Sequence, residues 1–297
     1  MIFGTLAQSL ILPLSSGLEK AMFLFLLASG LSLIFGVSRT LNLAHGSFYM
    51  VAAYLGYTFV RIFPSNLFGF IVSVIIAAVS VMCLGGVVEV VLLRRVYRSG
   101  ELYIVLITFS LILILEAAVT HFWGTGLLSV PLPGSFNHII TIDGAPIPLY
   151  NLLLIGLGIV IGAILWWAVY RTRWGLNVRA AAVDREMASA LGLNEKRLFT
   201  YVFLVGSLLA GLAGALAAPL LSLQPTMDAD IIIQVFAVVV IGGLGSLTGS
   251  LVAAILIGEL EAFGVISFPS LALPLLFLVM AVTLVIRPWG LFGREGA

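Results

Sequence analysis

Long apolar runs separated by short polar segments make up most of the chain. A helix that crosses the hydrocarbon core of a bilayer takes about 20 residues, and these runs have that order of length. Runs such as Phe70–Val79 show no alternation of polar and apolar positions, which excludes transmembrane β-strands. Backbone groups in lipid must bond internally, so we expect helices. The predicted spans are Ala21–Val37, Ser47–Phe63, Leu67–Leu93, Leu102–Trp123, Leu149–Tyr170 and Leu198–Leu221, followed by the longer region Ile231–Ile286.

The last apolar region is too long for one helix and contains helix breakers. Dense glycine disfavours a helix, and broken helices at membrane depth often border a substrate path. We therefore expect three passes, the first two short and arranged as half-helices or as a re-entrant pair near residues 242–249. The breakers are Gly242, Gly243, Gly245 and Gly249, then Phe268-Pro269-Ser270, then Pro274.

The distribution of lysine and arginine predicts the orientation, because short cytoplasmic loops are enriched in both. The loops Gly124–Pro148 and Ser222–Asp230 contain neither residue and are predicted to lie outside. Alternation then gives about nine crossings, within a range of about eight to ten, with the first span starting outside. Lys20 and Arg61 fall on the outer side, and Met1–Pro13 is expected to lie flat or to enter the bilayer. Three basic clusters are predicted to be cytoplasmic: Arg94, Arg95 and Arg98; Arg171, Arg173, Arg179, Arg185, Lys196 and Arg197; and Arg287 and Arg294.

Composition supports the same class. Of 297 residues, 62% are hydrophobic and 9% are charged, with a mean hydropathy of +1.22, whereas soluble domains have about 25% charged residues. We predict an all-α integral membrane protein, a polytopic helical bundle with one domain over residues 1–297 and a cytoplasmic coupling loop at 171–197. A net charge of +1 suggests no nucleic-acid partner. Cys83 is the single cysteine, which leaves no disulfide framework and no thiol metal site.

The start of the chain does not resemble a cleavable signal peptide. The first basic residue, Lys20, follows an apolar start, so the positively charged segment that precedes the apolar core of a signal peptide is missing. The first span is therefore expected to serve as an uncleaved insertion signal.

One cytoplasmic segment shows helical order. Val183, Met187 and Leu191 recur at four-residue spacing, which places them on one face of a helix. Gly192 suits the position that ends such a helix, and Asn194 suits the N-cap of the next one. The pattern predicts a single amphipathic helix over residues 179–191. It is either a linker or helix at the lipid headgroups, or a docking helix for a cytosolic partner.

Carboxylates inside apolar runs are candidates for function. Glu116 lies well inside Leu102–Trp123, where it either lines a pathway or makes a structural hydrogen bond to a neighbouring helix. Glu89 lies near a cytoplasmic end and is expected to pair with Arg94 or Arg95. The chain shows no glycine-rich loop followed by Lys-Ser/Thr, and its three histidines are far apart. We predict a protein that is not an enzyme and holds no metal or cofactor.

Four segments carry a more specific pattern. The first contains Phe35-Gly36-Val37, Asn42, Ala44-His45-Gly46 and Phe48-Tyr49; the others are Arg179–Leu193, Gly242–Gly249 and Arg287–Gly293. In this order they resemble the first span junction, the coupling loop, the glycine-rich break and the C-terminal ending of branched-chain amino acid ABC transporter permeases. The resemblance covers almost the whole chain.

The resemblance implies the permease subunit of an ATP-binding-cassette importer in the bacterial inner membrane. Its implied partners are cytosolic ATP-binding subunits, a second homologous permease and a periplasmic solute-binding protein. The implied substrate is a branched-chain amino acid or a related small polar solute; the family also transports urea, short amides and some aromatic acids. The candidate coupling residues are Arg179, Val183, Met187, Leu191 and Gly192, and those for the translocation path are Asn42, His45, Glu116, Gly242, Gly243 and Gly245.

Two other classes of protein remain as alternatives. A secondary transporter driven by an ion gradient would use an intramembrane acid such as Glu116 and would need no docking helix. A membrane scaffold without transport activity would use the polar loop as a binding segment.

Overall fold

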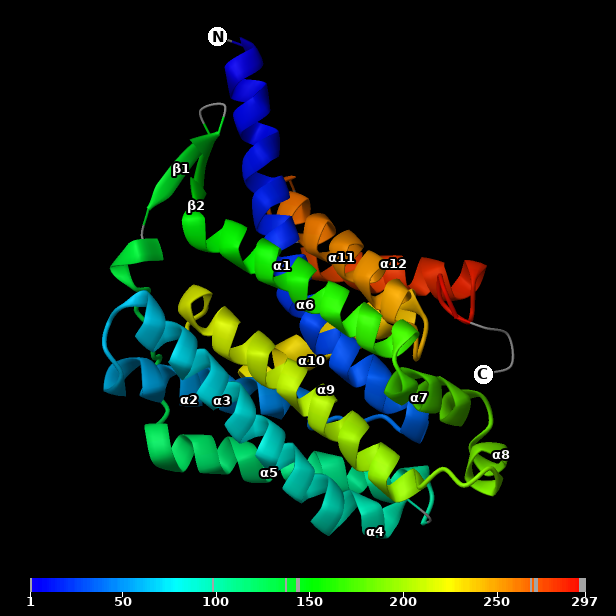
Figure 1. Cartoon of the computed structure of the whole chain (residues 1–297). Helices are drawn as coiled ribbons and strands as arrows, with labels where there is room; N and C mark the ends of the chain where they lie inside the picture. Colours follow the sequence, from blue (N-terminus) through cyan, green and yellow to red (C-terminus); the bar gives the residue numbers. More distant parts are fainter. Residues whose placement is uncertain are drawn as a thin grey trace.

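The computed structural model is almost entirely helical (Figure 1). It describes residues 2–97, 99–136, 138–142, 145–267, 269 and 272–293. Arg98, Phe268, Ser270 and Arg294, which the sequence predictions named, lie outside the described residues. The helices are α1 (Ile2–Ser38), α2 (His45–Ile62), α3 (Leu67–Val88), α4 (Arg94–Val96), α5 (Glu101–Trp123), α6 (Leu149–Arg171), α7 (Arg173–Val183), α8 (Arg185–Ala190), α9 (Glu195–Ala217), α10 (Met227–Gly242), α11 (Leu247–Ser267) and α12 (Ala272–Ile286).

Six apolar segments among the described residues are long enough to cross a membrane. They comprise α1, α5, α6, α9 and α11, together with the segment that runs from α3 through α4. The helices α2, α10 and α12 are shorter or more polar and complete the bundle. The predicted class, a polytopic all-α membrane protein, is confirmed.

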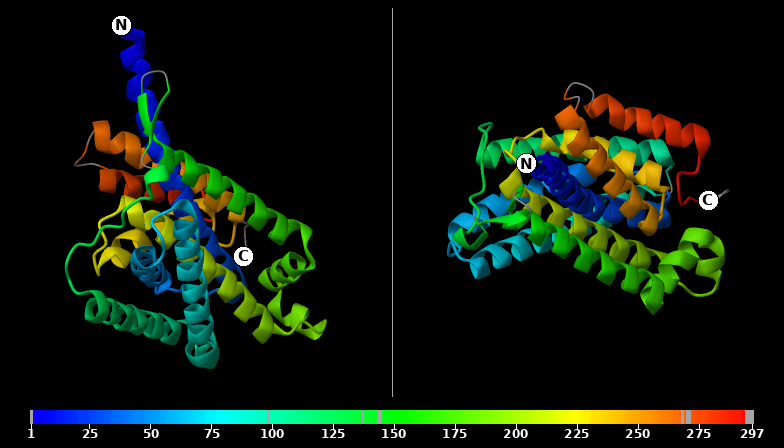
Figure 2. Two further views of the ribbon diagram at one scale, coloured as in Figure 1. Left: turned by 60° about the vertical axis from the view of Figure 1, so that its left-hand side comes forward. Right: turned by 90° about the horizontal axis from the view of Figure 1, so that it is seen from above.

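The helices α1 and α9 form the centre of the bundle. Their apolar windows are 83% and 72% buried, whereas those of α5 and α6 are 28% and 22% buried. Seen from above, α1 runs through the middle of the molecule with the other helices around it (Figure 2). The protein therefore buries α1 and α9 within itself and leaves much of α5 and α6 exposed.

Close backbone packing holds α9 against its neighbours. A Cβ atom on Gly214 would lie 2.1 Å from the carbonyl oxygen of Tyr49 in α2. One on Gly211 would lie 2.8 Å from the Cα atom of Ala78 in α3. Small residues allow such approaches between membrane helices, where dispersion contacts replace the hydrophobic driving force.

The first helix begins well before the predicted span Ala21–Val37. Met1–Pro13 was expected to lie flat or to enter the bilayer, and residues 2–38 form one continuous helix that includes Pro13. Proline removes one backbone hydrogen bond and bends a helix without having to end it. The outer half of α1 projects beyond the bundle (Figure 1).

A small β-hairpin lies beside this projecting half of α1. Strand β1 (Ile139–Ile142) pairs antiparallel with β2 (Ala145–Pro148), and Ala145 and Ile147 are buried. A second contact at the same end joins Leu128 and Leu223 through a backbone bridge. We call this the hairpin end, and the opposite end, which carries α4, α7 and α8, the basic end.

Candidate functional site

The predicted single helix over residues 179–191 is wrong: the segment forms two helices, α7 and α8. Asp184 has extended backbone angles, φ −145° and ψ 104°, and separates them. Its Oδ1 accepts a hydrogen bond of 2.9 Å from the backbone N–H of Met187. Aspartate favours caps over helix interiors because its side chain bonds to nearby backbone groups. The apolar spacing was read correctly, but the capping residue inside it was missed.

The two helices present the predicted apolar residues to the outside. Val183, Met187 and Leu191 expose 68%, 58% and 80% of their surfaces. Because α8 has its own N-cap, these side chains lie on two short helices joined at Asp184 rather than on one stripe. We call Val183, Met187 and Leu191 the apolar triad. It lacks a cover within the described chain.

Both predicted helix boundaries after α8 are confirmed. Gly192 has φ +92°, a conformation that favours glycine. The N–H of Leu193 donates to the carbonyl of Ala188 at 3.1 Å, and that of Gly192 donates to Ser189 at 2.9 Å, which is the glycine-terminated arrangement expected at a helix end. Asn194 caps α9 by accepting from the N–H of Arg197 at 3.1 Å.

Arg179 contacts the bundle. Its guanidinium stands 5.3 Å from the ring centre of Tyr170 on α6. It also lines a cavity of about 70 Å³ together with Ser32, Gly36 and Gly245. Arg179 therefore packs α7 onto the bundle.

A second arginine also joins α7 to the bundle. Arg39, directly after α1, donates from Nη2 to the carbonyls of Ala182 and Val183 at 3.3 and 3.4 Å. Both carbonyls belong to the last turn of α7, where no N–H group of the same helix is available to donate to them. The end of α1 thus holds the end of α7.

The glycine break is present, and its arrangement is tighter than predicted. Gly243 and Gly245 have φ values of +101° and +80° and form the turn between α10 and α11. Ser246 caps α11, because its Oγ accepts from the N–H of Gly249 at 3.1 Å. The expectation that both flanking helices are short is wrong: α11 has 21 residues and meets the length of a span, and only α10, with 16, is short.

The C-terminal segment closes over this break. The N–H groups of Leu291 and Phe292 donate to the carbonyls of Ile241 and Gly242 at 2.8 and 3.1 Å. On the other side, a Cβ atom on Gly245 would lie 3.3 Å from the Cα atom of Gly36 in α1. A Cβ on Gly242 would lie 2.5 Å from the carbonyl carbon of Gly249. The break is a packed joint at the basic end.

The predicted path residues Asn42 and His45 lie where α2 begins, deep within the bundle. His45 is fully buried, and its Nε2 lies 3.0 Å from the carbonyl oxygen of Leu27, near the middle of α1. Its Nδ1 and both polar atoms of the buried Asn42 make no hydrogen bond with the described residues. This part of the core therefore holds polar groups with unused bonding capacity.

A second polar group lies around Asp228, and of its members only Glu116, which is half-buried, was predicted. Ser47 donates to the Oδ2 of Asp228 at 2.5 Å, and the carboxyl group of Glu116 lies close enough to that of Asp228 to interact with it. Asp228 was assigned to the outer loop Ser222–Asp230, but it is buried in the first turn of α10. The available signal was its position three residues before the apolar region that begins at Ile231.

The first turns of α2 and α10 meet at this group. A Cβ atom on Gly46 would lie 2.7 Å from the carbonyl oxygen of Asp228. The meeting point combines a hydroxyl and two carboxyl groups, which can bind hydrogen-bond donors in the middle of an apolar bundle. Among the residues that the structure describes, no three His, Cys, Asp or Glu side chains gather to hold a metal ion.

The comparison with protein families agrees with this architecture. Residues 14–285 match the family described as the branched-chain amino acid transport system / permease component. The match includes the polar interior, the α7–α8 element and the glycine break.

Individual relatives match along their length. BraD of Pseudomonas aeruginosa, a high-affinity branched-chain amino acid transport system permease protein, is 27% identical and aligns with 95% of each chain. LivH of Escherichia coli, with the same description, is 24% identical over 91% of each chain. A partial match, 29% identical over 48% of this chain and 45% of its own length, is the ribose import permease protein RbsC of Bacillus subtilis.

These matches and the helical architecture agree on the class of protein. The family model spans almost the whole chain, and the full-length relatives are transport permeases. The apolar helices make it a multi-pass membrane protein. The chain belongs to the family of branched-chain amino acid transport system permease components.

Proposed function

We propose that the chain is the membrane-spanning permease subunit of an ATP-binding-cassette importer for branched-chain amino acids in the bacterial inner membrane. The observation that carries this proposal is the family match over residues 14–285, with full-length relatives named for that transport. In this proposal ATP hydrolysis belongs to a partner subunit, and the chain itself performs no covalent chemistry.

The apolar triad is the proposed docking surface for the ATP-binding subunit. Amphipathic helices commonly bind by placing an apolar face in a groove of the partner. Burial of each side chain is worth about 1.5–3 kcal/mol, so Val183, Met187 and Leu191 together provide enough free energy for a stable contact. Gly192 fixes the direction in which the chain leaves α8, and Arg179 and Arg39 fix α7 on the bundle.

The interior polar residues are the proposed lining of the translocation path. Asn42 and His45 form one part, and Glu116, with Ser47 and Asp228, forms the other. Buried polar groups in membrane helices usually face a bundle interior or pathway. Gly242, Gly243 and Gly245 form the packed joint that holds α10 and α11 against α1 at the basic end of this path. A second homologous permease and a periplasmic solute-binding protein complete the proposed complex.

Uptake by the reconstituted complex tests the proposal. The permease, its genomically adjacent permease and ATPase genes and their binding protein are reconstituted in liposomes, and labelled leucine, urea and ribose are supplied in parallel. We expect ATP-dependent uptake of leucine, with valine and isoleucine as competitors. Uptake of urea or ribose alone would reassign the substrate. Uptake that an ionophore abolishes and that needs no ATP would identify a secondary transporter.

A further inference from the structure

The basic end of α3 contains an unusual turn. Residues Glu89–Leu93 form a π-helix between α3 and α4, a rare element that is often found at functional positions. The Glu89 side chain has no exposed surface. Its Oε2 accepts from Nη2 of Arg94 at 3.1 Å, and its Oε1 lies 3.4 Å from Nε. The predicted pairing of Glu89 with an arginine is thereby confirmed.

The π-turn explains how these two residues meet. In an α-helix, side chains five residues apart point about 140° away from each other. The i to i+5 bonding of a π-turn widens the turn and brings such residues toward one face. The wider turn therefore aims both Glu89 and Arg94 at α9.

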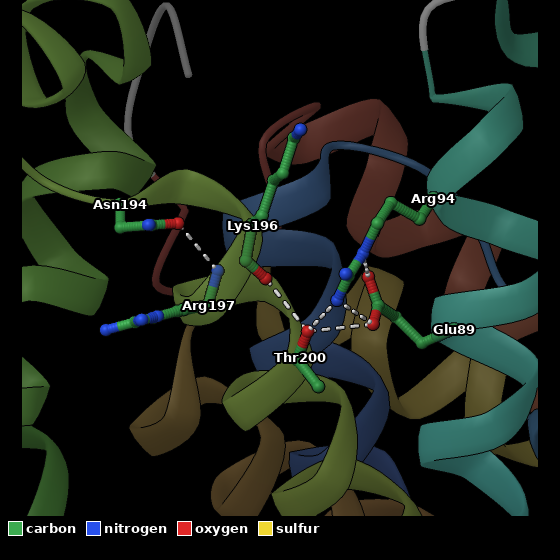
Figure 3. A network of polar contacts seen from close by, with 6 residues as sticks. All are labelled: Glu89, Arg94, Asn194, Lys196, Arg197 and Thr200. Atoms are coloured by element: carbon green, nitrogen blue, oxygen red, sulfur yellow. Dashed lines mark hydrogen bonds and ion pairs between the residues drawn. The ribbon is translucent and has the colours of Figure 1, made fainter.

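Thr200 of α9 joins this pair (Figure 3). Its Oγ1 accepts from Nη2 of Arg94 at 2.5 Å and lies 2.8 Å from Oε2 of Glu89. The same hydroxyl lies 2.8 Å from the carbonyl oxygen of Lys196. A buried carboxylate requires such partners, because an unpaired charge inside a protein is strongly destabilising. We call Glu89, Arg94 and Thr200 the polar node.

Contacts continue from the polar node to α8. Arg185 of α8 donates from Nε to Oε2 of Glu195 at 2.9 Å, and its guanidinium lies 4.3 Å from the ring centre of Phe199. Phe199 packs edge-to-face against Tyr97, with ring centres 5.4 Å apart. The first turns of α9 thus contact α8 on one side and the π-turn and the residue after α4 on the other.

We propose that Glu89, Arg94 and Thr200 are positioning residues that transmit displacement of α8 to α3 and α9 together. The inference rests on the proposed function, because it requires an ATPase that moves the α7–α8 element. Thr200 lies one turn into α9, beyond the cap that Asn194 provides. The directional bonds of the polar node fix this part of α9 to α3, so a movement of α8 reaches both helices.

Thr200→Val tests the polar node with a minimal change. It removes the hydroxyl, keeps the shape and leaves the Glu89–Arg94 ion pair. In the reconstituted complex we expect ATPase association and basal ATP hydrolysis to stay unchanged, while leucine uptake per ATP falls about tenfold, the order expected for a hydrogen bond to a charged group. Thr200→Ser should restore the ratio. The matched control is Thr283→Val in α12, whose hydroxyl bonds only within its own helix, to the Val279 carbonyl at 2.8 Å.

Two results would overturn the inference. One is wild-type uptake per ATP in Thr200→Val. The other is a proportional loss of association, hydrolysis and uptake, which indicates a structural role only. If Thr200→Val does not fold, Arg185→Gln serves as the test, with Arg95→Gln at an exposed position as its control. Unchanged leucine uptake per ATP in Arg185→Gln would reject the linkage.

A distance measurement separates this inference from the proposed substrate. In a Cys83→Ser background, spin labels at Ser189 on α8 and Val87 on α3 report the movement that ATP causes, with no transported solute needed. In the wild type α3 follows α8, so this distance should change little when ATP binds. In Thr200→Val α3 should lag behind α8, and the distance should change more. If the wild-type complex imports no leucine but the distance change still depends on Thr200, the substrate proposal fails and the linkage stands. An identical change in both proteins rejects the linkage.

Discussion

The glycine break and the α7–α8 element both lie at the basic end, but only one of them is closed by the chain itself. At the break, α1 and the C-terminal segment approach from two sides, and backbone hydrogen bonds from Leu291 and Phe292 close it. At the α7–α8 element, three apolar side chains remain largely exposed. Dense glycine in this chain marks a close internal contact, whereas the apolar residues beside charged ones form an exposed surface, which we propose that a partner subunit covers.

The two regions also differ in how rigidly the chain holds them. The break is fixed by left-handed backbone conformations at Gly243 and Gly245, which are costly for other residues. The α7–α8 element is fixed through the backbone carbonyls at the end of α7 by Arg39 and through Glu195 by Arg185, while the side chains of the apolar triad stay exposed. Substitutions should therefore damage folding at the first region and partner binding at the second.

The largest expected effect comes from replacing Met187 and Leu191 together with Asp. Two buried apolar side chains contribute about 3–6 kcal/mol to a contact, so ATPase association should weaken by about 100-fold or more. Co-purification of the ATPase measures this directly, and the melting temperature of the permease should not change. Met187→Leu keeps an apolar side chain and serves as the control. Retained association in the double variant would show that the triad is not the docking surface.

Gly245→Leu tests the closed region. The residue has φ +80°, and a new Cβ would lie 3.3 Å from Gly36, so backbone strain and crowding should cost about 2–4 kcal/mol of stability. We expect a lower melting temperature and less folded permease in the membrane. Leu244→Ala, at an exposed neighbouring position, should have little effect. Full stability with abolished uptake would instead show that Gly245 acts in the translocation path without being needed for packing.

Asp228→Asn tests whether the enclosed polar interior serves transport. It preserves size but weakens the contacts with Ser47 and Glu116, and we expect uptake to fall about tenfold, as for loss of a hydrogen bond to a charged group. Asp230→Asn, at an exposed position in the same first turn of α10, is the matched control. Equal uptake by both variants would remove Asp228 from the proposed path.

The smallest effect is expected from Asp184→Ala. Loss of an N-cap costs about 1 kcal/mol, which corresponds to roughly fivefold weaker ordering of α8. ATPase association should decrease several-fold, and Asp184→Asn, which can still cap, should retain it. If Asp184→Ala bound the ATPase more tightly, the continuous helix over residues 179–191 would be the form that docks.

The sequence predicted features that depend on neighbouring residues along the chain. The helix end at Gly192 and the cap at Asn194 were correct because both follow from local backbone chemistry. The exposed apolar triad was also identified, since spacing alone places its members. The break at Asp184 was missed because a four-residue apolar period outweighed a capping residue within it.

Features set by distant contacts were harder to predict. The π-turn at Glu89 accompanies an ion pair that also contacts Thr200, 111 residues away. Asp228 read as a loop residue because nothing near it in the sequence reveals Ser47, its partner from α2. The positions of charged residues in the sequence indicate on which side of the membrane a loop lies and how deep a residue is. Which residue pairs with a buried charge depends on how distant helices pack.

The hydrogen bonds from Leu291 and Phe292 to α10 have a consequence for biosynthesis. Ile241 and Gly242 leave the ribosome about 50 residues before the segment that pairs with their carbonyls. Until that segment arrives, water or the insertion machinery must satisfy both groups, because lipid offers no donors. The joint between α10 and α11 is therefore completed only after α12 has followed, and a chain stopped between Ile286 and Leu291 would leave these two carbonyls without their partners.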